Sequence, residues 1–162
     1  MDITSYLTID SEVQGNITGS CEHRDHKGKM VVLAFDHGVE IPLVLEHGKV
    51  GGKPTHQPVV VEKDIDCATP KLYQALFRGE KLSQVNIEWY RFGGKGVQEL
   101  YYKIELSGAL ISSIVPSAPH VLNNDFERWQ LSERISFIYE SITWSWGNSG
   151  EILYRQNWLL TD

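Results

Sequence analysis

The feature that most constrains the fold of this chain is that only the stretch from Thr69 to Gly79 has the pattern of a helix. Thr69 is expected to cap its N-terminus through the side-chain oxygen, and Pro70 suits the first helical position because no backbone N–H is needed there. Gly79 can take the positive φ that ends a helix. The expected apolar face comprises Leu72, Tyr73, Ala75, Leu76 and Phe77. A helix of about two or three turns is marginal alone, so it must pack on a sheet.

The other patterned segments have the period of two that is typical of half-buried antiparallel strands. In the clearest one, which ends at Arg91, Val85, Ile87 and Trp89 share one face. Strands are expected over residues 6–9, 30–35, 39–45, 59–65, 85–91, 97–106, 109–115, 131–146 and 152–158. With one helix available for a crossover, this pattern favours a small antiparallel β-barrel or sandwich over a doubly wound fold. We therefore predict one mainly β domain over residues 1–162.

Breaks in the pattern predict where the chain turns. Residues 14–19 read as a glycine-hinged turn at a sheet margin, and Gly108 is expected to break or bulge a strand. Residues 93–96 predict a hairpin turn, and the long strand 131–146 is expected to bend near Ser141. The nearly continuous apolar run 30–35 predicts a strand buried on both faces.

Residues 46–58 contain three glycines and two prolines, which interrupt any regular pattern. They predict a long loop or a protruding hairpin. Connections of about a dozen residues are uncommon unless they are functional or disordered, so this segment is a candidate contact surface.

The charge balance excludes some partners. The 162 residues include 15 Lys and Arg against 21 Asp and Glu, a net charge of -6, without the basic surface that binding to nucleic acid requires. No apolar run is long enough for a membrane span, and the first residues do not have the form of a secretory signal. We expect a protein made in the cytoplasm without membrane insertion. Cys21 and Cys67 are expected to be reduced thiols, with a disulfide between them as the alternative.

Candidate catalytic groups form no recognisable constellation. Cys21, His23 and His26 are spaced unlike a structural zinc site, although a small metal-dependent hydrolase built on them stays an alternative. Asp64 and Asp66 are expected to face solvent rather than to act as paired carboxylates. The remaining histidines are scattered, at positions 37, 47, 56 and 120. We expect no enzyme activity, cofactor or metal.

The tryptophans near the end of the chain allow two interpretations. Trp144 and Trp146 alternate in phase with Ile138 and Ile142, which favours a place in the core or at a subunit interface. Together with Trp158 they are also the residues that a carbohydrate-binding β-sandwich would use to stack on sugars. That binding module is the alternative function from a different class.

Five short motifs, in this order along nearly the whole chain, carry a family resemblance. They are residues 14–19 (QGNITG), 33–37 (LAFDH), 56–58 (HQP), 70–91 (with PKLYQAL, GEK and WYR) and 142–144 (ITW). In these motifs the chain resembles the haemolysin-coregulated protein (Hcp) family, the inner-tube subunit of the bacterial type VI secretion system.

The resemblance implies a small β-barrel with one short helix on its side, assembled as a homohexameric ring that stacks head to tail into a tube. In that family the tube is built inside a contractile sheath and expelled, carrying a spike protein at its tip together with effectors. Secretion by that machine without a signal peptide and a structural, non-enzymatic role are implied as well.

The resemblance also suggests roles for particular residues. We expect Glu46, His47, Lys49, Lys53 and His56 to form the loop through which rings stack. Asp36 is expected at the position that faces the lumen, where some members have a small residue that contacts effectors. Trp144 and Trp146 are the expected subunit-interface residues. Because the sequence ends at Asp162, soon after its last expected strand, we expect a plain tube subunit without a toxin extension.

Overall fold

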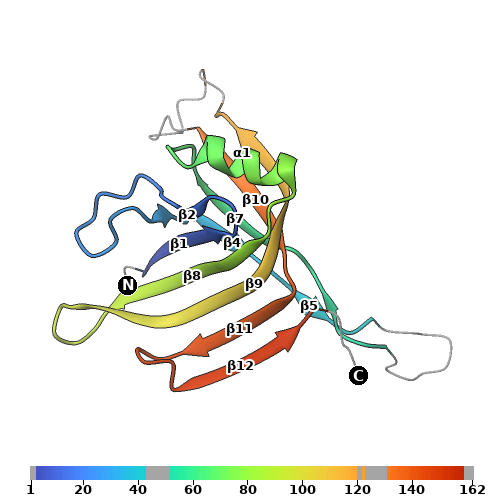
Figure 1. Cartoon of the computed structure of the whole chain (residues 1–162). Coiled ribbons are helices and arrows are strands. Elements are labelled where there is room, and N and C mark those ends of the chain that lie inside the picture. The colour runs from blue at the N-terminus through green and yellow to red at the C-terminus, as the bar shows by residue number, and fades with distance from the viewer. Residues whose placement is uncertain (1–2, 43–51, 120–121, 123–130, 159–162) are drawn as a thin grey trace.

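The computed structural model describes residues 3–42, 52–119, 122 and 131–158. The described strands are β1 (Ile3–Ser11), β2 (Gly15–Ile17), β3 (Met30–Val31), β4 (Ala34–Asp36), β5 (Val39–Glu40), β6 (Thr55–His56), β7 (Val59–Asp64), β8 (Leu82–Phe92), β9 (Gln98–Ser117), β10 (Ser132–Ile138), β11 (Ser141–Trp146) and β12 (Ile152–Asn157), and the helix is α1 (Thr69–Arg78). The predicted mainly β, antiparallel fold with one short helix is confirmed (Figure 1).

The long strand β9 organises the sheet because it changes partners along its length. Its first half pairs with β8 on one side and with β11 on the other, while its second half pairs with β10. The β11 pairing ends at Ser107 and the β10 pairing begins at Leu110. Between them Gly108 has a φ of 60°, a conformation that costs glycine little. The predicted break or bulge at Gly108 is wrong, because β9 runs through it as one strand and its register with β8 is the same on both sides.

Residues 30–36 join the two ends of the hydrogen-bonded path β1–β8–β9–β10–β7. Their first part, β3, pairs with β1, and their second part, β4, pairs with β7. Between the strands, Val32 N donates to Ser5 O and Leu33 N donates to Glu62 O. Backbone hydrogen bonds therefore run around the whole core, as in a small barrel.

The predicted two-sided burial of this segment is wrong. Met30 and Val32 lie in the core, whereas Val31 and Leu33 are exposed. A strand that closes a barrel has one face inside and one outside, so its alternate side chains reach solvent even when they are apolar. The expected strand from Val39 onward is described only as β5, since residues 43–51 lie outside the described part of the chain.

The core contains the apolar side chains that alternation predicted. Val85 and Ile87 of β8, Ile104 and Leu106 of β9 and Ile142 of β11 are buried. Helix α1 adds Leu72 and Ala75 to the same cluster. Phe77, which was predicted on the apolar face of α1, is instead 85% exposed. It follows Leu72 by five positions, which turns it about 140° around the helix and away from the sheet.

The predicted cap of α1 is wrong at Thr69. The N-cap residue is Ala68, and no side chain caps the helix there. The Thr69 hydroxyl instead donates to Glu133 Oε1 of β10 (2.8 Å) and accepts from the backbone N–H of Asp66 (3.1 Å). The helix start is thus held by a buried carboxylate rather than by a local cap. Pro70 is the second residue of the helix, one position later than predicted, and Gly79 occupies its predicted place at the end with a φ of 58°.

Lys63 and Glu133 form a buried ion pair beneath the start of α1. Lys63 is 1% and Glu133 0% exposed, and Lys63 Nζ donates to Glu133 Oε1 at 2.7 Å. The ammonium also donates to Asp66 Oδ1 (2.9 Å) and to the backbone oxygen of Asp64 (2.8 Å), so each of its three N–H groups has an acceptor. The predicted solvent-facing role of Asp66 is therefore wrong, because its carboxylate helps to compensate a buried charge.

The other end of α1 is held by Glu80, a second buried carboxylate. Glu80 accepts hydrogen bonds from Ser11 Oγ (2.9 Å), Gln14 Nε2 (2.9 Å) and Gln74 Nε2 (3.1 Å). Burial alone raises the pKa of Glu80, but these hydrogen bonds outweigh it and hold the pKa below its ordinary value. Ser11 and Gln14 belong to the end of β1 and the turn after it, so Glu80 ties the helix to that edge of the sheet.

Candidate functional site

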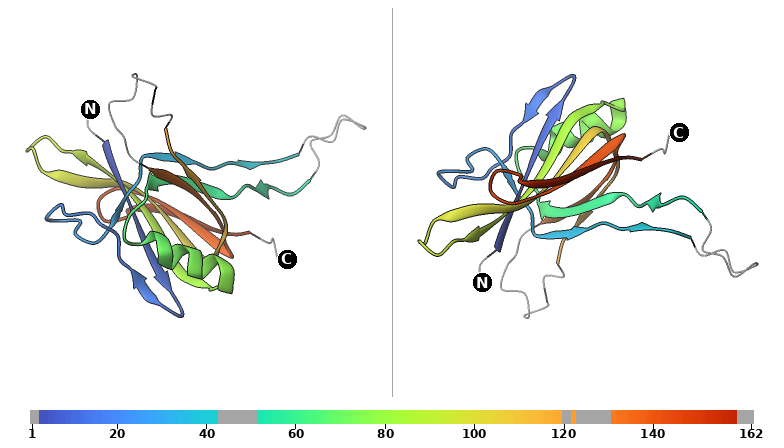
Figure 2. Two further views of the ribbon diagram at one scale, coloured as in Figure 1. Left: turned by 90° about the horizontal axis from the view of Figure 1, so that it is seen from above. Right: turned by 90° about the horizontal axis from the view of Figure 1, so that it is seen from below.

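A ribbon of two strands, β5 and β6, extends away from the rest of the molecule (Figure 2). Its register pairs Val39 with His56 and Glu40 with Thr55, and Gln57 N donates to Gly38 O at its root. We call residues 38–42 and 52–57 the β5–β6 ribbon. Within the described residues, its strands form a two-stranded sheet of their own, separate from the main sheet.

The root of this ribbon meets the body of the protein at four side chains, His37, His56, Tyr139 and Trp158, which we call the histidine–tyrosine cluster. The Tyr139 hydroxyl lies 2.7 Å from His56 Nδ1 and 3.0 Å from His37 Nε2. The His56 ring stacks on the Trp158 indole with centroids 5.3 Å apart, and Tyr139 meets Trp158 edge to face at 4.7 Å. Tyr139 lies in the bend between β10 and β11, and Trp158 directly follows β12.

The environment of the cluster disfavours charge. Burial lowers the pKa of His37, and the neighbouring His56 lowers it further, while Asp36 and a hydrogen bond to the backbone of Gln57 act in the opposite direction. Burial also lowers the pKa of His56 and raises the pKa of the Tyr139 phenol. Both imidazoles and the phenol are thereby favoured in their neutral forms.

The residues predicted for ring stacking lie in different places. Glu46, His47 and Lys49 are outside the described residues. Lys53 is exposed on the ribbon. His56 is only 5% exposed and belongs to the histidine–tyrosine cluster, so it does not present its ring on an outer loop as predicted.

Asp36, the predicted lumen position, is the last residue of β4. It is exposed and pairs with Val60 of β7. A place toward a tube lumen stays a prediction for this residue.

Strand β12 presents an open apolar edge. In the described residues, β12 pairs with β11 alone, which leaves its second edge without a strand partner. Ile152, Leu153 and Tyr154 are 66%, 64% and 62% exposed. Because successive residues of a strand point to opposite faces, this edge is apolar on both sides.

The three tryptophans do not form one stacking platform. Trp144 is half-buried against the core, Trp146 is 50% exposed at the end of β11, and Trp158 stacks on His56. The interface role predicted for Trp144 and Trp146 stays a prediction. Their arrangement gives no support to the sugar-binding alternative, which needs several indole faces on one exposed surface.

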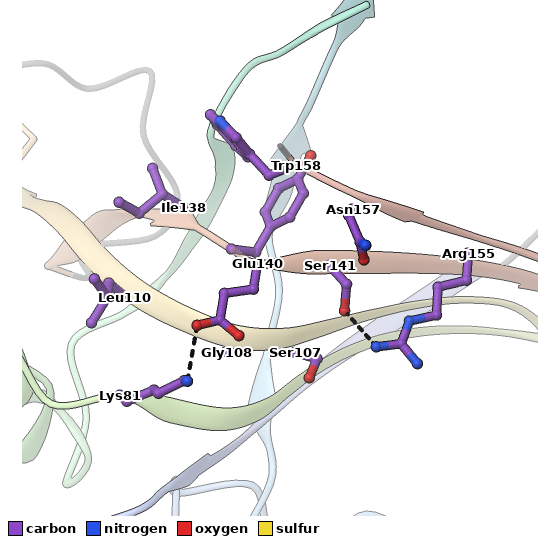
Figure 3. A pocket seen from close by; sticks show the side chains of 11 residues that line it. Lys81, Ser107, Gly108, Leu110, Ile138, Glu140, Ser141, Arg155, Asn157 and Trp158 are labelled. Atoms are coloured by element: carbon purple, nitrogen blue, oxygen red, sulfur yellow. Dashed lines mark hydrogen bonds and ion pairs between the residues drawn. The ribbon is translucent and has the colours of Figure 1, made fainter. Parts of the chain in front are cut away.

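A groove of about 590 Å³ lies beside the cluster, where β9, the β10–β11 bend and β12 meet (Figure 3). Leu110, Ile138 and Trp158 form its apolar wall. At its rim Lys81 pairs with Glu140 (2.9 Å), and Arg155 Nη2 donates to Ser141 Oγ (3.2 Å). Tyr139 and Trp158 of the histidine–tyrosine cluster are thus among the residues that line this groove.

The histidines considered as metal ligands have structural contacts instead. His26 is buried, and its ring stacks on Tyr6 at 4.0 Å. Its Nε2 lies 2.9 Å from Gln98 Oε1, and its Nδ1 lies 3.2 Å from Lys29 Nζ. The structure thus uses His26 to hold the loop between β2 and β3 against the sheet. Cys21 and Cys67 are free thiols.

No group of three or more His, Cys, Asp or Glu side chains suited to a metal ion is found in the described part of the chain. None of its helices has the length and apolar character needed to cross a bilayer.

These features define a class of protein: a small antiparallel β subunit with an open apolar edge and a projecting ribbon, suited to building a larger assembly. Residues 6–146 match the family model described as "Type VI secretion system effector, Hcp". The chain belongs to the Hcp family, the tube proteins of the type VI secretion system.

Individual relatives agree with this assignment over nearly the full chain. The "Major exported protein" of Pseudomonas aeruginosa is 33% identical over 159 residues, which cover 93% of this chain and 92% of the relative. Hcp3 from P. aeruginosa is 30% identical with a TM-score of 0.79, covering 98% of this chain and 99% of that structure. A mutant of Hcp1 from Escherichia coli EAEC 042 is 26% identical with a TM-score of 0.86, covering 98% and 100%.

Proposed function

We propose that this chain forms homohexameric rings that stack into the inner tube of a type VI secretion system. In this proposal the contracting sheath expels the tube into the medium or a target cell, with a spike protein at its tip and effectors as cargo. Membership of the Hcp family and the relative named as a major exported protein support it. The subunit acts by assembly and has no enzymatic step.

The observation that carries the proposal is the open edge at β12. Proteins that stay monomeric usually protect an edge strand with lysine, proline or a bulge, because its unpaired backbone groups can pair with another chain. β12 presents Ile152, Leu153 and Tyr154 consecutively, all largely exposed. An edge of this kind is stabilised when a second copy covers it, and a heterologous contact repeated around an axis closes a ring.

The β5–β6 ribbon supplies the second contact that a tube requires. Head-to-tail stacking joins two different surfaces, so each ring needs an element that projects toward the next. The ribbon projects from the body, and its residues Val39 and Ile41 are exposed and available to such a contact. We therefore assign ring stacking to the ribbon and ring closure to the β12 edge.

The test is the native mass of the purified full chain by light scattering. A hexamer of 18.4 kDa chains has a mass of about 110 kDa, and stacked rings are larger. We expect Leu153→Arg, which puts a charge at the centre of the exposed edge, to shift the mass to that of a monomer. Phe77→Arg is the matched control, because Phe77 is equally apolar and more exposed but lies on α1.

Two outcomes contradict the proposal. One is a wild-type chain that is strictly monomeric at every concentration and salt tested. The other is a ring that Phe77→Arg dissociates while Leu153→Arg leaves it intact, which moves ring closure from β12 to the helix.

A further inference from the structure

The β5–β6 ribbon has few attachments to the protein that carries it. In the described residues its strands pair with each other and with no strand of the main sheet. At the root, His37 and His56 both reach the hydroxyl of Tyr139, which belongs to the β10–β11 bend. One phenol therefore joins both arms of the ribbon to the body.

The hydrogen bonds of this phenol fix which atoms carry protons. A tyrosine hydroxyl has one proton to donate, and a neutral histidine has one N–H and one accepting nitrogen. The Gln57 backbone offers His37 a second hydrogen bond, so His37 donates there and its Nε2 accepts the Tyr139 proton. His56 then donates its Nδ1–H to the hydroxyl oxygen. The chain of donors and acceptors is therefore complete only while His37 is neutral, since a protonated His56 still carries its Nδ1–H.

Protonation of His37 breaks this chain. An imidazolium has N–H on both nitrogens, so its Nε2 can no longer accept the Tyr139 proton. The hydroxyl proton is then left without an acceptor in a site that is largely shielded from water, which is costly. A charge on His56 is opposed by its burial between Tyr139 and Trp158.

The surrounding charges offer little compensation. Asp36, next to His37 at the end of β4, favours a cation there, whereas His56 on β6 disfavours one. Glu140, which follows Tyr139, points to Lys81 of the turn before β8. Arg155 of β12 binds Ser141 at the groove rim and adds a second positive group on this side. Asp36 is thus the single carboxylate among these groups that is placed to favour a charged histidine.

We infer that the histidine–tyrosine cluster is a pH-dependent lock, which fixes the β5–β6 ribbon to the body when His37 and His56 are neutral and releases it when they are protonated. This goes beyond the proposed function, because it concerns the attachment of the ribbon within one chain. Its consequence for stacking, that rings join more weakly in acid, rests on the proposed function.

The direction of the pH effect follows from linkage. The pKa values of His37 and His56 are lowered in the locked form from an ordinary value of 6.5. Lowered values mean that the released form binds more protons. The lock is therefore fully effective above pH 6.5 and weakens as the pH falls through the lowered values.

The test is amide hydrogen exchange of the full chain at pH 7.5 and pH 5.5, corrected for the intrinsic exchange rate at each pH. We expect the Gln57 amide, which donates to Gly38 O at the root of the ribbon, to exchange about fivefold faster at pH 5.5, because one hydrogen bond of the lock is lost. Amides of the β1–β8 ladder should exchange equally at both values. Equal ribbon exchange at both pH values overturns the inference.

Variants separate the lock from other pH effects. His37→Gln with His56→Gln keeps uncharged side chains that can donate and accept, so ribbon exchange should no longer depend on pH. His23→Gln is the matched control, because His23 is exposed and lies in the loop between β2 and β3. It should keep the wild-type difference. A pH difference that survives in the double variant contradicts the assignment to these histidines.

Two further measurements distinguish a failure of the lock from a failure of the proposed assembly. Nuclear magnetic resonance titration of the histidine rings in the wild-type chain should show His37 and His56 titrating below 6.5, whether or not the variants fold, and ordinary titration of both contradicts the lock. Native mass of the exchange samples reports ring formation separately. A hexamer with pH-independent ribbon exchange rejects the lock alone, and a monomer with the expected exchange rejects the proposed assembly alone.

Discussion

The side of the protein covered by α1 and the β11–β12 side differ in where they place polar and apolar side chains. At the two ends of α1, the carboxylates of Glu133 and Glu80 are buried and are held by two and three side-chain donors, respectively. At β12, apolar side chains stand in solvent beside an unpaired strand edge. Figure 1 shows α1 and β12 at opposite ends of the molecule. Because a second chain can pair with an open strand edge and cover the apolar side chains beside it, we propose that the first side serves folding and the second assembly.

The largest effect expected from this contrast is on the helix side, at the Lys63–Glu133 pair. Lys63→Met leaves the Glu133 carboxylate buried with the Thr69 hydroxyl as its remaining donor, and Glu133 Oε2 already has no partner. Removing one partner of a buried ion pair costs about 3–5 kcal/mol of the free energy of unfolding. Urea unfolding of the dilute, monomeric chain measures it.

The double variant Lys63→Met with Glu133→Leu sharpens this prediction. It removes both charges, so its loss of stability should be clearly smaller than the sum of the two single losses. Lys81→Met is the control at an exposed ion pair, and we expect no measurable change there. Additive losses in the double variant would show that the two charges do not depend on each other.

The same contrast explains how much of the fold the sequence predicts. Signals that act within a few residues are reliable here, such as Pro70 and Gly79 at the ends of α1 and the alternation of β8. The prediction that Thr69 caps the helix was wrong because its hydroxyl donates to Glu133, which is 64 positions away. A better signal was available, since Lys63 and Glu133 each alternate in phase with buried residues of their strands. Opposite charges on two apolar strand faces predict a buried ion pair.

The functional features were harder to predict for a related reason. The histidine–tyrosine cluster combines His37, His56, Tyr139 and Trp158, whose spacing along the chain follows no motif, because four separate segments bring them together. Strand β12 was predicted over residues 152–158. Its position at an edge depends on strand order, which one sequence does not determine. The family resemblance predicted assembly, whereas the surfaces that we propose for it were found only in the structure.

A smaller effect is expected at the other buried carboxylate. Ser11→Ala removes a hydrogen bond to Glu80 and two that the Ser11 oxygen accepts from Val13 N and Gln14 N. Hydrogen bonds to charged groups contribute about 1.5–3 kcal/mol, so the loss should fall in that range at neutral pH. Ser83→Ala, whose exposed hydroxyl donates to Asp10 O, should change the free energy of unfolding by less than about 0.5 kcal/mol.

The pH dependence of the Ser11→Ala effect identifies its cause. The pKa of Glu80 is lowered from an ordinary 4.5, so the folded chain favours the ionised form. The corresponding stability is present above pH 4.5 and is lost as the pH falls through the lowered value. The variant should therefore differ most from the wild type at pH 7 and approach it in acid. A difference that stays constant down to pH 3 would assign the loss to packing.

The smallest effect on stability is expected at the open edge. Leu153 is 64% exposed, so Leu153→Ser removes little buried apolar area and should change the free energy of unfolding of the dilute monomer by less than about 0.5 kcal/mol. At concentrations where rings form, the same variant should lower the apparent stability in a concentration-dependent way, because the assembly that stabilises the wild type is weakened. Thermal unfolding across a concentration series measures both. Destabilisation of the monomer itself would mean that β12 already contributes to the fold of the single chain, and the division between a folding side and an assembly side would then fail at this strand.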